Sequence, residues 1–226
     1  LSESFSKTKE GKALREGVKH IELVTDEVFK NLSDTQTPQG ILALVKQYHY
    51  TLEEVAGGSR KSAQAEELQE KPALLMVLET IQDPGNLGTI LRAGEGAGVT
   101  GIVMDANTAD IYNPKVIRST MGSVLRMPFV YVENLHETLE ELKKKKIRLF
   151  AAHLQGKHAY DQEDYTGPAA FLIGNEGNGL TEETAAMADT YIRIPMEGRV
   201  ESLNAAVAAS VLMFEAARQR RNHTGK

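Results

Sequence analysis

After Pro72 the chain alternates short apolar runs with stretches long enough to form helices. Six of these runs are typical of strands: residues 73–78, 101–104, 129–132, 148–152, 169–173 and 191–194. Because strands that alternate with helices are joined by crossover connections, the pattern predicts an α/β fold with a parallel sheet covered on both faces. Residues 203–221 carry small and apolar side chains on all sides until Arg218, which predicts a substantially buried final helix.

The first 71 residues have a weaker pattern. Residues 1–47 show modest helix and strand signals and end in the apolar run 41–45, so we interpret them as part of a small α/β domain. Residues 48–71 are rich in Glu, Gln, Ser, Ala and Gly, which predicts a linker or a solvated helix. For a chain of 226 residues we therefore expect two unequal domains, the larger spanning 72–226.

Composition limits the classes of function. The absence of cysteine excludes Cys-ligated zinc and thiol nucleophiles, and it favours a reducing cytoplasm. No apolar run approaches the roughly 20 residues that span a bilayer, and we expect neither a membrane segment nor a signal peptide. The net charge of -5 disfavours nucleic-acid binding through bulk charge, so RNA contact would need a local basic group such as Lys115, Arg118 and Arg126.

Three polar or glycine-rich segments follow predicted strands, where open parallel sheets bind ligands. The first contains the turn Asp83-Pro84-Gly85 and then Asn86, placed to cap a helix that carries Arg92. Taken alone, this first segment is explained by a turn, a helix cap and a surface arginine. The nearby Gly-x-Gly-x-x-Gly at 96–101 closes a helix and precedes a strand, the reverse of a dinucleotide-binding fingerprint, so we interpret it as a helix C-cap and turn.

The second segment, 171–180, runs from a strand into a glycine-rich turn, after which Thr181 opens a helix. Its glycines would let backbone amides face a ligand, and Glu176 disfavours a triphosphate while permitting a neutral or cationic ligand. In the third segment, 194–204, Ser202 can cap the final helix. Capping does not explain the presence of Asn204, because a side-chain amide at the start of an otherwise apolar helix needs a hydrogen-bond partner.

Together these segments resemble the signature motifs of the SpoU/TrmH family of RNA ribose 2'-O-methyltransferases, within the SPOUT superfamily. The resemblance covers residues 72–226. It lies in Asp83-Pro84-Gly85-Asn86-Leu87-Gly88 with Arg92, in Gly174-Asn175-Glu176-Gly177 with Gly179-Leu180, and in Ile194-Pro195-Met196 with Gly198 and Ser202-Leu203-Asn204. Residues 1–47 are similar to the family's substrate-recruitment domain, without its beginning.

The resemblance implies a cytoplasmic homodimer that uses S-adenosylmethionine, and no metal, to methylate a ribose 2'-hydroxyl of structured RNA, with rRNA slightly favoured over tRNA. It also implies that the C-terminal chain of the sheet domain forms a trefoil knot. The implied catalytic residues are Asn86, Arg92, Glu176, Ser202 and Asn204. The implied cofactor-binding residues are Ile173, Gly174, Ile194, Met196 and Leu203. A further similar segment, Asn113-Pro114-Lys115 with Arg118, indicates that the basic stretch including Arg126 faces RNA.

A guanidinium stays protonated at physiological pH, so Arg92 is a poor general base. Our hypothesis is that Arg92 orients an RNA phosphate and stabilises the developing 2'-oxyanion, while the proton passes to water or a nearby carbonyl. Three alternatives stand beside this function: a SPOUT enzyme that methylates a base, an RNA-binding or assembly protein of the same fold without methyl transfer, and a nucleotide-binding Rossmann enzyme. The ribose-type motifs disfavour the first, and the glycine polarity disfavours the last.

Overall fold

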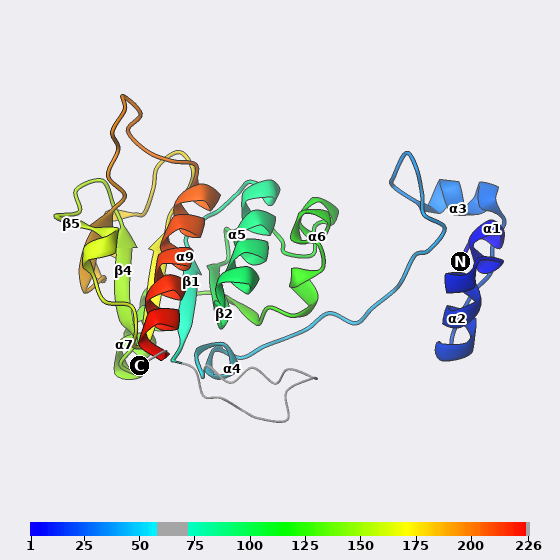
Figure 1. Cartoon of the computed structure of the whole chain (residues 1–226), viewed down its shortest axis with the longest axis horizontal. Coiled ribbons are helices and arrows are strands. Elements are labelled where there is room, and N and C mark those ends of the chain that lie inside the picture. The colour runs from blue at the N-terminus through cyan, green and yellow to red at the C-terminus, as the bar shows by residue number, and fades with distance from the viewer. Residues whose placement is uncertain (58–71, 225–226) are drawn as a thin grey trace. The chain divides into compact units, whose positions relative to one another are not determined.

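The computed structural model describes residues 1–57 and 72–224, in two compact units that divide after Tyr48 (Figure 1). The smaller unit holds the helices α1 (Glu3–Ser6), α2 (Lys9–Gly17) and α3 (Asp26–Leu32) and a parallel bridge between Ser2 and Val24. The apolar run 41–45 forms no strand with any described residue, and Leu44 is 97% exposed. A strand forms only beside a partner that pairs with its backbone groups, and none of the described residues pairs with this run.

The larger unit is built on a parallel sheet, as predicted. Its strands are β1 (Leu74–Leu78), β2 (Gly101–Asp105), β3 (Phe129–Val132), β4 (Arg148–Ala152), β5 (His158–Ala159), β6 (Ala169–Ile173) and β7 (Thr190–Arg193). They lie in the order β3-β2-β1-β6-β4-β7-β5, and every pairing is parallel. The six predicted strands all form, whereas the two-residue β5 is too short to leave an apolar pattern.

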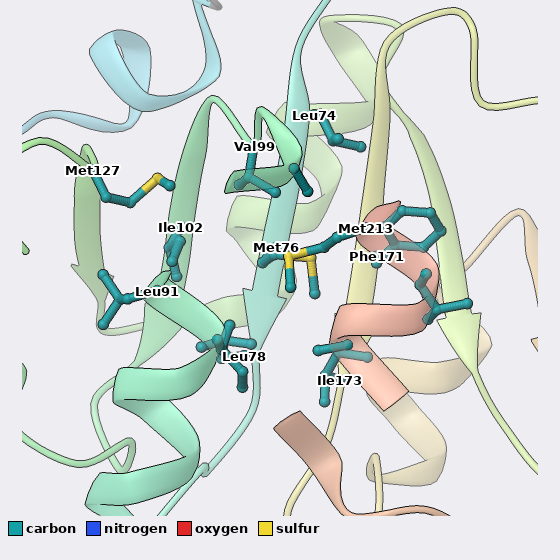
Figure 2. Packing of buried hydrophobic residues seen from close by; sticks show 14 of the residues in the cluster. Leu74, Met76, Leu78, Leu91, Val99, Ile102, Met127, Phe171, Ile173 and Met213 are labelled. Atoms are coloured by element: carbon teal, nitrogen blue, oxygen red, sulfur yellow. The ribbon is translucent and has the colours of Figure 1, made fainter. Parts of the chain in front are cut away.

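Helices cover both faces of this sheet. One face carries α5 (Pro84–Ala97), α6 (Pro114–Thr120), the short 3-10 turn η1 (Ser123–Leu125) and α9 (Ala205–Thr224), and the other carries α4 (Leu52–Ala56), α7 (Leu135–Lys144) and α8 (Glu182–Ala186). A second 3-10 turn, η2 (Tyr160–Gln162), follows β5. The all-apolar β1 serves both cores, since its alternate side chains point to opposite faces. Figure 2 shows Met76 of β1 and Met213 of α9 in the first core.

The predicted linker is partly structured. Residues 52–56 form α4, which packs against β2. Its residue Val55 is fully buried. Gly101 permits this contact, because a Cβ there would lie 2.5 Å from Cγ1 of Val55. The larger unit therefore begins well before residue 72; the rest of the predicted linker, 58–71, lies outside the described residues.

The final helix α9 forms as predicted and packs along α5 (Figure 1). The two helices lie close at Gly94 of α5, where a Cβ would lie 3.4 Å from Sδ of Met213. The helix is not buried on all sides, since Val207 and Phe214 are each 49% exposed. The trefoil knot stays a prediction from the resemblance. Across residues 1–57 and 72–224, no helix is long and apolar enough to cross a membrane.

Candidate active site

A cavity of about 540 Å³ opens at the carboxyl edge of the sheet. Strand β4 lies between β6 and β7, so the loops that follow these three parallel strands meet at one edge, and the start of α9 closes the site. This is where open α/β sheets bind ligands. The cavity is lined by residues 152–154, 173–179, 192–196, 201–203, 205 and 208.

The loop after β6 is a tight hairpin that requires glycine. A Cβ on Gly174 would lie 2.1 Å from the backbone of Gly179, and Gly179 itself has a φ of 72°. The backbones of Asn175 and Gly179 donate to each other at 3.0 and 2.9 Å. The amides of Gly177 and Asn178 donate to Oδ1 of Asn175, at 2.9 and 3.2 Å, so they do not face a ligand as the glycines suggested.

Three loops are joined by a chain of side-chain hydrogen bonds. Nδ2 of Asn86 donates to Oε1 of Glu176 at 2.9 Å, and Nδ2 of Asn204 donates to Oδ1 of Asn86 at 2.9 Å. Glu176 also accepts from the backbone amides of Gln82 and Asp83, at 3.2 and 3.1 Å. The structure thus brings together three residues that are separated by as many as 118 positions. We call Glu176, Asn86 and Asn204 the polar chain.

Two helix caps differ from the prediction. Asp83, not Asn86, caps α5, because Pro84 occupies the first helical position and the Asp83 side chain accepts from the Asn86 amide. Asn204, not Ser202, caps α9: its Oδ1 accepts from the amides of Ala206 and Val207, at 2.9 and 3.2 Å. Asn204 therefore caps α9 and bonds Asn86 at once, while Ser202 lines the cavity.

Hydrogen bonding keeps Glu176 ionised. Partial burial of the carboxyl opposes ionisation, but donors from Asn86 and from the backbone of Asp83 and Gln82 outweigh it, so the pKa of Glu176 lies below its usual value. The site therefore carries a fixed negative charge at neutral pH, which suits a neutral or cationic ligand.

Arg92 stands apart from the polar chain. It lies on the exposed side of α5, does not line the cavity, and makes no hydrogen bond or ion pair with a described residue. Arg92 lies six positions after Asn86, so the two side chains point to different sides of the helix. Within one chain, the structure does not bring Arg92 to Glu176 and Asn204.

The five residues predicted to contact the cofactor all line the cavity: Ile173, Gly174, Ile194, Met196 and Leu203. The sequence missed the wall formed by the loop after β4, which contributes His153 and Leu154. His153 packs on Tyr191 with ring centroids 5.1 Å apart. The segment has no glycine-rich turn, and the one usable signal was its position directly after a predicted strand.

The residues predicted to contact RNA differ in whether an acidic side chain already pairs with them. Lys115 and Arg118 are exposed on α6 and form no ion pair with the described part of the chain. Arg126 is also exposed, but it forms a two-pronged ion pair with Glu95, which raises the pKa of Arg126. Because Glu95 already neutralises it, Arg126 offers less charge to a phosphate than the other two.

Comparison with known proteins gives two family matches. The model described as "SpoU rRNA Methylase family" matches residues 73–214, and the one described as "RNA 2'-O ribose methyltransferase substrate binding" matches residues 4–51. The 23S rRNA (guanosine(2553)-2'-O)-methyltransferase RlmP of Bacillus subtilis is 31% identical over 85% of this chain and 70% of its own length. The 23S rRNA (guanosine-2'-O-)-methyltransferase RlmB of Xylella fastidiosa is 39% identical over 66% of this chain and 59% of its own length.

Solved structures agree with these matches. The SpoU methyltransferase AviRb from Streptomyces viridochromogenes, in complex with the cofactor AdoMet, has a TM-score of 0.81 and 27% identity, covering 95% of this chain and 79% of that one. An AdoMet-bound rRNA methyltransferase from Sinorhizobium meliloti has a TM-score of 0.78 and 30% identity, covering 93% of this chain and 76% of that one.

Proposed function

Because this chain belongs to the SpoU rRNA methylase family, we propose that it transfers a methyl group from S-adenosylmethionine to a ribose 2'-hydroxyl of ribosomal RNA. The observation that carries the proposal is the polar chain, which joins the three motif loops beside the cavity. Relatives named as 23S rRNA methyltransferases, RlmP and RlmB among them, favour rRNA over tRNA as the substrate.

The cavity fits S-adenosylmethionine in size and character. Its volume of about 540 Å³ lies within the roughly 300 to 1,000 Å³ typical of small-molecule sites. Apolar side chains such as Ile194 and Leu203 can cover a nucleoside, and the ionised Glu176 favours a cation. The bound cofactor would supply the methyl group on a positively charged sulfonium.

We assign distinct roles to the residues around it. Ile173, Gly174, Ile194, Met196 and Leu203 bind the cofactor. The polar chain fixes the loops relative to one another, so that Ser202 and Asn204 align the acceptor ribose; positioning of this kind supplies a large share of the rate of a bimolecular transfer.

Arg92 has a different task. Its guanidinium has no partner among the described residues, so it is available to bind an RNA phosphate and to stabilise charge that develops on the 2'-oxygen. The exposed Lys115 and Arg118 would contact further phosphates, and residues 4–51, which match the substrate-binding model, would recruit the RNA.

We also propose that the protein acts as a homodimer in the cytoplasm. Val207 and Phe214 leave apolar surface exposed on α9, the helix that packs beside the α5 of Arg92. An interface over this surface would cover it and bring Arg92 toward the cavity of the partner subunit. The cytoplasmic location follows from a substrate that, in the bacterial relatives, is ribosomal RNA.

The function is tested with purified protein, labelled S-adenosylmethionine, and rRNA and tRNA from cells that lack the gene, with 2'-O-methyl sites mapped on each RNA. We expect methylation of one rRNA ribose. Arg92→Ala should lower kcat by about 10²- to 10³-fold, the usual loss when one charge-stabilising donor is removed. Lys144→Ala, which removes an exposed charge from α7, is the control and should keep full activity.

Two results would contradict parts of this proposal. Cofactor binding without methylation of any RNA would favour an RNA-binding or assembly protein, and methylation of tRNA alone would overturn the rRNA assignment. Mixing the inactive variants Arg92→Ala and Glu176→Ala tests the shared site: activity should return if Arg92 acts across the subunit boundary, and should stay absent if each chain holds a whole site.

A further inference from the structure

Glu79 is a buried carboxylate to which the proposed chemistry gives no role. It follows β1 and is 8% exposed. Its Oε1 accepts from the hydroxyls of Thr181 and Thr184, at 2.8 and 2.5 Å, and its Oε2 accepts from the amide of Thr181 at 2.8 Å. A buried charge is costly unless it is hydrogen bonded, and these three donors provide that compensation.

The same residue holds both ends of the loop 174–180. The Glu79 amide donates to the carbonyl of Ile173 at 2.9 Å, immediately before the loop begins. The Glu79 carboxylate holds Thr181, which follows the loop and caps α8. One residue at the end of β1 therefore fixes the points where the cavity loop leaves the sheet and enters the next helix.

The neighbouring Thr80 holds the loop at a third point. Its carbonyl accepts from Nδ2 of Asn175 at 2.8 Å, while its amide and hydroxyl each donate to Asp105 at 2.8 Å. Thr80 has a φ of 57°, a conformation that a β-branched residue adopts only where its surroundings impose it. The end of β1 is thus built as a rigid support for the loop after β6.

We propose that Glu79 is a positioning residue for the cofactor cavity. Its carboxylate fixes the loop 174–180, whose residues 174–179 line the cavity, and so holds Glu176 within reach of Asn86. Glu79 does not line the cavity itself, so its effect on a ligand passes through the loop. The proposal rests on the proposed function in one respect, the identity of the ligand as S-adenosylmethionine.

The test compares Glu79→Gln with Glu183→Gln, which makes the same change on the exposed first turn of α8. Glutamine keeps the size of the side chain, but its NH2 group cannot accept from a threonine donor. We expect Glu79→Gln to raise the Kd for S-adenosylmethionine about tenfold, with kcat at saturating cofactor within about threefold of the parent, since Glu79 does not line the cavity. Hydrogen exchange across 174–180 should accelerate, and Glu183→Gln should change none of these quantities.

A milder variant covers the case in which Glu79→Gln does not fold. Thr184→Val removes one of the three donors and keeps the shape of the side chain, so it should give a smaller rise in Kd and a smaller increase in exchange. A purely stabilising role for Glu79 predicts a lower melting temperature with an unchanged Kd and unchanged loop exchange in the folded protein. That result would overturn the proposal, and so would a fall in kcat with an unaltered Kd.

The outcomes also separate this inference from the proposed function. If the parent protein bound no S-adenosylmethionine, the proposed function would fail. The exchange measurement needs no cofactor, so it would still decide whether Glu79 holds the loop.

Discussion

Glu176 contributes to stability through its charge as well as its shape, because its donors favour the ionised form. Its folded pKa lies below the ordinary value of 4.5, so the stabilisation is present above about that pH and is lost as the pH falls through the lowered folded value. We expect Glu176→Gln to lower the free energy of unfolding at pH 7 by at most about 1 kcal/mol, since the side chain is exposed to solvent.

Urea denaturation at neutral pH and at about pH 3 measures this difference, which should shrink toward acid. Glu182→Gln, an exposed site on α8, provides the comparison. A stability difference that grew as the pH fell would contradict the lowered pKa of Glu176.

Gly88 is required by packing rather than by its backbone conformation. A Cβ at this position of α5 would lie 1.6 Å from Oγ of Ser119 and 3.0 Å from the carbonyl of Val116, both on α6. Gly88→Ala should therefore destabilise the fold by about 1 to 3 kcal/mol, the usual cost of overpacking. In Gly96→Ala, on the same helix, the new Cβ meets only the Phe214 ring at 3.8 Å, so stability should hold or rise. Equal melting temperatures for the two variants would refute the argument.

At the scale of elements, two substitutions of Asn204 distinguish its role as the cap of α9 from its hydrogen bond to Asn86. Asn204→Ala removes the cap of α9 and should cost about 0.5 to 2 kcal/mol in unfolding free energy. Asn204→Asp keeps the accepting oxygen but loses the amide that donates to Asn86. We expect Asn204→Asp to keep most of the stability and lose methylation activity. If both variants lost activity only in proportion to their unfolded fraction, the polar chain would have no role in the reaction.

The elements were largely predictable because buried parallel strands are continuous apolar runs, as β1 and β6 are. Helix caps were less predictable. Asp83, Asn86, Ser202 and Asn204 all have side chains able to cap, and the choice depends on where the chain enters the helix. A helix within 48–71 was one of two predicted alternatives, but the burial of α4 was missed because it is five residues long and its core contacts, Val55 and Ala56 with Leu52 beside them, are few apolar positions in a polar segment.

The site was predictable from the family motifs and only partly from the residues themselves. Elementary rules place ligands at strand ends, but no spacing rule shows that Glu176 reaches Asn86 across 90 positions. That contact requires β1 and β6 to be neighbours, which is a property of the sheet order. The role of Arg92 could not be predicted from the residues of one chain, because the role proposed for it depends on RNA and on a partner subunit.

At the scale of the whole molecule, the proposed homodimer depends on the apolar surface of α9. Phe214→Glu places a charge on a side chain that is 49% exposed, and it should shift the protein to monomer in sedimentation experiments because a buried unpaired charge opposes association. Leu44→Glu, at a 97% exposed position of the smaller unit, should leave the assembly unchanged. If Phe214→Glu sedimented like the parent protein, α9 would not form the interface.

The bond between Asn204 and Asn86 makes the order of synthesis matter. Asn204 is synthesised after every strand of the sheet, because β7 ends at Arg193. A nascent chain that already carries β1 through β7 would still lack the wall of the pocket that residues 201–203, 205 and 208 form. Binding of the methyl donor would therefore have to wait until this segment has been made and has folded against the sheet.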